Sequence, residues 1–151
     1  YKESPNSNLD QSSTIEAISA IQNFINKYPY SDYSFEANKI IDELQVKLET
    51  KNFDNAKQYY KTRNYKSAII ALDNFENDFP DSSFNEEGAY LRILSQYLIS
   101  INSFEDLQEK RFKETIEFYL KFVDKYPTSP FLAEAEKMYV ESLNLLTKFA
   151  E

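Results

Sequence analysis

Apolar and polar residues alternate along this chain with the spacing of amphipathic α-helices. Apolar side chains recur every three or four residues, as at Ile18, Ile21 and Ile25, and this spacing places them on one face of a helix. No segment alternates strictly between apolar and polar residues, so no strand pattern competes. We predict helices over residues 14–28, 33–62, 65–78, 83–101, 105–125 and 130–149, after a polar loop over residues 1–12.

Prolines and hydroxyl residues indicate where these helices end and begin. The residue before a proline is displaced from the helical conformation, so Pro29, Pro80 and Pro127 each predict a helix end. A hydroxyl followed three residues later by a carboxylate predicts an N-terminal cap. Weak helix formers around Asn52 leave a break in the second helix open. The predicted caps are Ser13 with Glu16, Ser31 or Asp32, Ser83 with Glu86, and Ser129 followed by Pro130.

One motif occurs three times, over residues 17–37, 68–88 and 115–135. Each copy has an aromatic residue before the proline, a serine two residues after it, another aromatic residue, and then a glutamate beside a small residue. Each copy covers the end of one helix and the start of the next. The prolines are 51 and 47 residues apart. This repetition predicts stacked antiparallel helix pairs, which form an α-solenoid.

Composition limits the chemistry that the chain can perform. Among its 151 residues there is no cysteine, no histidine and one glycine. This excludes thiolate catalysis and disulfides, removes the commonest general base, and excludes glycine-rich phosphate loops. The net charge of −8 argues against nucleic acid and anionic lipid as partners. We predict a protein without catalytic, metal or cofactor sites.

The repeat resembles the tetratricopeptide repeat, in which a small residue, two tyrosines, an alanine and a closing proline recur at fixed spacing. The spacing from Ala68 to Pro80 fits that pattern, and Thr115 departs from it mildly. The period exceeds the usual 34 residues, which we attribute to longer first helices. We therefore expect residues 1–151 to form a single all-α array. The structural repeat positions are Ala17, Pro29, Ala37, Ala56, Tyr59, Tyr65, Ala68, Pro80, Gly88, Pro127 and Ala135.

Two stretches carry a more specific pattern. These are residues 4–29, SPNSNLDQSSTIEAISAIQNFINKYP, and residues 44–71, LQVKLETKNFDNAKQYYKTRNYKSAIIA. Both resemble one family, the outer membrane assembly lipoprotein BamD and its relatives. The resemblance implies a scaffold on the periplasmic face of a Gram-negative outer membrane. Its partners would be the periplasmic domains of the barrel-forming assembly subunit and unfolded outer membrane proteins. The chain opens in mid-pattern, so we read it as later repeats whose lipidated start lies upstream.

A different periplasmic tetratricopeptide adaptor, binding proteins or peptides, is the alternative. For either function the candidate partner-binding residues form a local basic patch with one tyrosine. They are Lys57, Tyr60, Lys61, Arg63 and Lys66. The same lysines and arginine are also compatible with a solvated helix end. The acidic residues Asp73 and Glu76 are expected on a solvated helix face, and the last helix is expected to cap the array.

Overall fold

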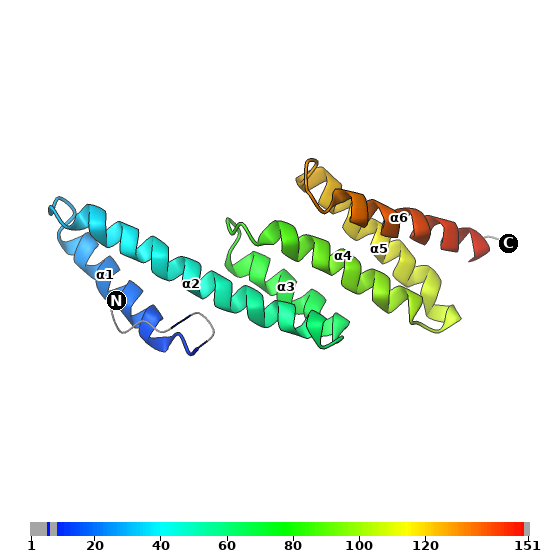
Figure 1. Cartoon of the computed structure of the whole chain (residues 1–151), viewed down its shortest axis with the longest axis horizontal. Coiled ribbons are helices and arrows are strands. Elements are labelled where there is room, and N and C mark those ends of the chain that lie inside the picture. The colour runs from blue at the N-terminus through cyan, green and yellow to red at the C-terminus, as the bar shows by residue number, and fades with distance from the viewer. Residues whose placement is uncertain (1–5, 7–8, 150–151) are drawn as a thin grey trace. The chain divides into compact units, whose positions relative to one another are not determined.

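The computed structural model describes residue 6 and residues 9–149, and this part of the chain is helical without strands (Figure 1). The predicted all-α, tetratricopeptide-like fold is confirmed. The predicted loop over residues 1–12 lies largely outside the described residues. The helices are α1 (Ser12–Lys27), α2 (Ser34–Lys61), α3 (Tyr65–Asp78), α4 (Asn85–Ile101), α5 (Glu105–Lys125) and α6 (Leu132–Leu146), followed by the short 3-10 helix η1 (Thr147–Phe149).

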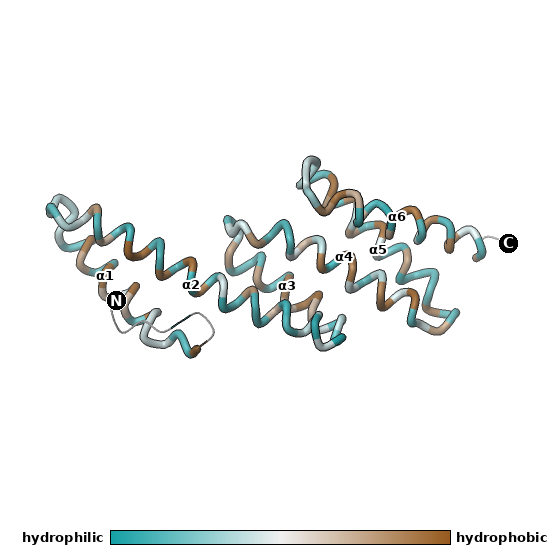
Figure 2. Tube along the Cα trace, viewed as in Figure 1, coloured by the Kyte–Doolittle hydropathy of each residue, from teal (hydrophilic) through white to brown (hydrophobic). Residues whose placement is uncertain are grey.

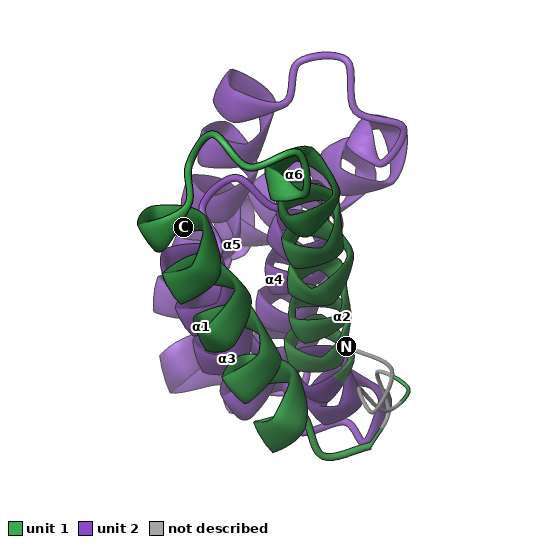
Figure 3. Ribbon diagram, turned by 90° about the vertical axis from the view of Figure 1, so that its left-hand side faces the viewer, with its two compact units in different colours: residues 1–54 green, residues 55–151 purple. Residues whose placement is uncertain are grey.

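The chain divides into two compact units, residues 1–54 and residues 55–151 (Figure 3). Unit 1 contains α1 and most of α2. Unit 2 contains the last turns of α2 and all later helices. Within unit 2 each of α3, α4 and α5 packs against the helix that follows it, and α4 also contacts α6. The second helix runs unbroken from Ser34 to Lys61, so the break considered near Asn52 is absent.

The three motif copies form the same junction, with matching backbone hydrogen bonds. At each, the serine Oγ accepts a bond from the amide two residues later, at 3.2–3.3 Å. The aromatic before the proline donates its N–H to the carbonyl of a phenylalanine four residues earlier. These two rings also contact each other, with centroids 5.2–5.5 Å apart. The serines are Ser31, Ser82 and Ser129, and the ring pairs are Phe24–Tyr28, Phe75–Phe79 and Phe122–Tyr126.

The predicted capping boxes are wrong at two helices. The first helix begins at Ser12, with Gln11 at the N-cap position, so Ser13 lies inside it. The fourth begins at Asn85, and the serine that bonds the chain there is Ser82, not Ser83. In a capping box the serine is itself the N-cap residue, whereas Ser82 lies two residues before the N-cap residue Phe84. Ser82 therefore closes a turn that precedes the helix. Pro130 likewise precedes the last helix rather than opening it.

The core of unit 2 lies where α4, α5 and α6 meet. Brown and teal stretches alternate along the helices in Figure 2, as expected for helices with one apolar face. Two offset aromatic pairs join the helices, Tyr90–Phe131 with centroids 4.8 Å apart and Tyr119–Tyr139 at 4.5 Å. The buried cluster consists of Ala89, Ile93, Tyr119, Phe122, Ala135 and Met138.

Equivalent aromatic residues differ in exposure between the units. Phe75 and Phe122 are 3% and 2% exposed, but Phe24, at the same motif position in α1, is 36% exposed. Phe122 belongs to a cluster with residues of α4 and α6 on either side, whereas α1 has only α2 beside it within unit 1. Aromatic residues therefore fill the seams between helices more completely in unit 2. Tyr30 and Phe35, at 98% and 84%, are the most exposed aromatics among the described residues of unit 1.

Candidate functional site

The turn between α2 and α3 holds an arginine in an unusual backbone conformation. Arg63 has a φ of 61°, the only positive φ among the described residues. Its N–H donates to the carbonyl of Tyr60 at 2.9 Å, and that of Asn64 donates to the carbonyl of Tyr59 at 2.8 Å. These two bonds form a Schellman motif, whose left-handed position is usually a glycine. An arginine there costs of order 1 kcal/mol, and such strain is concentrated at functional sites.

Arg63 lies at the rim of a depression that we call the basic groove. The groove consists of two adjoining hollows of about 530 and 410 Å³, which share Lys66, Ile99 and Arg111. Cations from three segments surround it, in a protein whose net charge is −8. Its basic residues are Arg63, Lys66, Lys110 and Arg111, and its apolar residues are Ile69, Ile70, Leu98, Ile99 and Leu107.

Neighbouring side chains hold the walls of the groove in place. Arg111 donates from Nη1 to the hydroxyl of Ser103, which directs its guanidinium toward the turn between α4 and α5. Gln96 donates to the Glu114 carboxylate at 2.7 Å. Tyr65 lines the groove and packs against Tyr60, with ring centroids 5.9 Å apart. The basic groove thus pairs anchored cations with apolar surface, which suits an acidic and partly apolar protein surface.

The five predicted partner-binding residues are placed differently. Arg63 and Lys66 line the basic groove. Tyr60 does not line it but contacts the ring of Tyr65, which does. Burial, and to a lesser degree Tyr65, raises the pKa of Tyr60. Lys57 forms an ion pair with Glu87 of α4. Lys61 is exposed and is not among the residues that line the groove.

The structure reverses the expected roles of the two adjacent tyrosines. Tyr59, assigned to the structural repeat position, is 45% exposed. Tyr60, expected to face a partner, is the half-buried one that contacts Tyr65. The two differ by about 100° around the helix axis, so only one can face the neighbouring helix. The structural position of the repeat therefore fits the half-buried Tyr60 better than the exposed Tyr59.

Sequence reasoning missed half of the basic groove. Lys110 and Arg111 lie more than 40 residues after Arg63, in the least motif-like part of the chain. The contact of α3 with α4, and of α4 with α5, brings them to the same hollow as Lys66. The only signal in the sequence for Lys110 and Arg111 was that they are basic residues on a neighbouring predicted helix.

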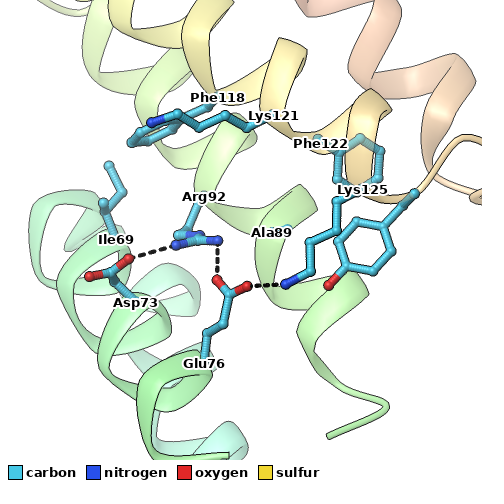
Figure 4. Close-up of a pocket in the computed structure, with 10 residues that line it drawn as sticks. Ile69, Asp73, Glu76, Ala89, Arg92, Phe118, Lys121, Phe122 and Lys125 are labelled. Carbon is cyan, nitrogen blue, oxygen red and sulfur yellow. Dashed lines mark hydrogen bonds and ion pairs between the residues drawn. The ribbon is translucent and has the colours of Figure 1, made fainter. Parts of the chain in front are cut away.

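A second pocket, of about 360 Å³, lies between α3, α4 and α5 (Figure 4). Arg92 of α4 donates to Asp73 at 2.7 Å and to Glu76 at 2.5 Å, and Lys125 of α5 donates to Glu76 at 2.5 Å. Asp73 is 60% exposed, as expected for a solvated helix face, but Glu76 is only 24% exposed, so that expectation is wrong for Glu76. Asp73 connects α3 to α4, and Glu76 connects α3 to both α4 and α5. We call this arrangement the ion-pair pocket; it also contains Lys121.

The charges of the ion-pair pocket stabilise one another. Burial by itself raises the pKa of Glu76, but hydrogen bonding by Lys125 and the charge of Arg92 outweigh it and hold that pKa below its ordinary value of 4.5. The hydrogen bond to Glu76 in turn raises the pKa of Lys125. Both shifts favour the charged forms of Glu76 and Lys125.

Metal-ligand clusters and membrane-spanning helices are both absent from the described residues. Within residues 6 and 9–149, no group of three acidic, histidine or cysteine side chains is placed to hold a metal ion. Among the helices described, none has the length and apolar character needed to cross a bilayer. Both sites present charged side chains next to apolar side chains.

Comparison with known proteins relates this chain to a protein family. The model of a family described as YfiO, outer membrane lipoprotein, matches residues 46–149, which is most of the chain. A search of the curated proteins finds no match. The matched segment includes both the basic groove and the ion-pair pocket.

Proposed function

Because the chain belongs to the YfiO family of outer membrane lipoproteins, we propose that it acts as a BamD-like, non-catalytic scaffold. It would take part in the assembly and insertion of β-barrel proteins into the outer membrane, on the periplasmic face. The family description supports the membrane association. The solenoid of unit 2, with its two surface hollows, supports a role in binding proteins.

The observation that carries this proposal is the position of Arg63. It occupies a backbone conformation that disfavours it and lies in a groove with three other cations. A charge-assisted bond from a guanidinium to a carboxylate is strong and geometrically specific. The proposed partner is therefore an acidic surface on the periplasmic domains of the barrel-forming assembly subunit.

The test is a titration of those purified domains into the chain and its charge-reversed variants. Arg63→Glu should weaken binding at least about tenfold, because loss of a charge-assisted contact and a new repulsion act together. Lys113→Glu is the matched control, since Lys113 is exposed, lies on α5 outside the groove, and pairs only with Glu109 one turn away. Equal affinities of both variants and the unmodified chain would refute the assignment of the groove.

An Arg63→Lys variant separates geometry from charge. Lysine keeps the charge but not the planar guanidinium, so we expect intermediate affinity. Binding that falls when salt is added supports the electrostatic contribution. If no variant and no condition shows binding of these domains, the general adaptor function takes the place of this proposal.

A further inference from the structure

We propose that the ion-pair pocket is a second protein-binding site, which takes an acidic side chain and a neighbouring aromatic side chain of a short partner segment. It lies between α3, α4 and α5 and shares with the basic groove only one lining residue, Ile69. The proposed barrel-assembly function does not use it. It therefore stands or falls independently of the basic groove.

Charge is the first argument for an acidic occupant. The pocket is lined by three cations, Arg92, Lys121 and Lys125, and by two carboxylates. Both carboxylates are engaged by Arg92 or Lys125. Lys121 alone has no carboxylate partner among the described residues, and Figure 4 shows no contact drawn to it. The pocket thus carries one uncompensated positive charge.

Hydrogen-bonding capacity points the same way. A guanidinium has five N–H donors, and Arg92 uses two nitrogens for Asp73 and Glu76. Its side chain is 20% exposed, so it still reaches the pocket. The Glu76 carboxylate, in contrast, is held on both oxygens. A basic ligand could pair with Glu76 only by displacing an existing cation, whereas an acidic ligand can contact Lys121 without displacing any group.

The apolar part of the lining explains the aromatic neighbour. Ile69, Ala89 and Phe118 from three helices line the same hollow. Lys121 and Phe118 project from adjacent turns of α5 (Figure 4). A ligand whose carboxylate contacts Lys121 can place a neighbouring aromatic side chain near Phe118, where aromatic rings associate in offset or edge-on geometry.

The test uses the blocked tetrapeptide acetyl-Ser-Glu-Phe-Ser-amide, titrated into the full chain and followed by amide NMR shifts. The expected result is saturable shifts at Ala89, Phe118 and Lys121. The same peptide with Gln for Glu should bind at least about tenfold more weakly, since a charge-assisted contact is lost. Replacing Phe by Ala in the peptide should also weaken binding.

Variants locate the site and separate it from the basic groove. Lys121→Glu and Lys121→Gln should each weaken the peptide at least about tenfold, while Lys113→Glu and Arg63→Glu should leave it unchanged. Lys121 is exposed, so these variants are expected to fold. Equal affinity for the Glu and Gln peptides, unchanged binding by Lys121→Gln, or shifts confined to the basic groove would each overturn the proposal.

Discussion

Glu76 connects three helices through one carboxylate. It lies on α3, accepts from Arg92 of α4 on one oxygen and from Lys125 of α5 on the other. Its side chain is 24% exposed, so solvent screens these pairs only in part. Isolated surface pairs contribute little, but a shared and half-buried acid with two partners contributes more.

We expect Glu76→Gln to lower the free energy of unfolding by about 1 kcal/mol at pH 7. The folded-state pKa of Glu76 lies below 4.5, so its stabilisation is fully present above that pH. It is lost as the pH falls through the lowered folded-state pKa. Urea denaturation at pH 7 and at pH 3 should therefore show a difference between variant and unmodified chain that shrinks in acid.

The control for this prediction is Glu109→Gln, which removes an exposed pair between adjacent turns of α5. Such a pair contributes roughly 0.2–0.5 kcal/mol. A loss at Glu76 no larger than at Glu109, or one that is independent of pH, contradicts the role assigned to Glu76.

At the scale of elements, the junction serines decide how one helix leads into the next. The sequence located every helix to within a few residues, because apolar spacing and the prolines are local signals. It misplaced the serine of one junction and the cap of the first helix, because a hydroxyl before a helix can close a turn or cap the helix. Only the path of the backbone shows that Ser82, and not Ser83, accepts the hydrogen bond at this junction.

Ser82→Ala should destabilise the protein by about 1 kcal/mol, because it removes the acceptor for the Phe84 amide in a partly buried turn. Ser83→Ala, one residue later and exposed, should change stability by less than about half as much. Thermal unfolding of the two variants measures the difference. The reverse order would restore the capping box that the sequence suggested.

At the scale of the molecule, the two units differ in how completely they bury the same motif. The local sequence pattern predicted which residues recur in each copy of the motif. It did not predict how many neighbouring helices would cover each copy. The basic groove was half predicted for the same reason. Arg63 and Lys66 are close in sequence, whereas Arg111 joins them only through packing of α3, α4 and α5.

The three equivalent phenylalanines test this difference directly. Phe75→Ala and Phe122→Ala should each cost about 3–5 kcal/mol, as for buried aromatic residues. Phe24→Ala should cost about half as much or less, since Phe24 already has 36% of its surface in solvent. Urea denaturation of the three variants gives the ranking, and an equal loss at all three positions would contradict the exposures described.

The left-handed backbone of Arg63 has a consequence for evolution. At such a position glycine is free of the steric cost that arginine bears, so selection for stability alone favours glycine. If the basic groove binds a partner as proposed, selection for that contact opposes the replacement. We then expect arginine at this position in related proteins that bind the same partner, and glycine or asparagine in those that do not.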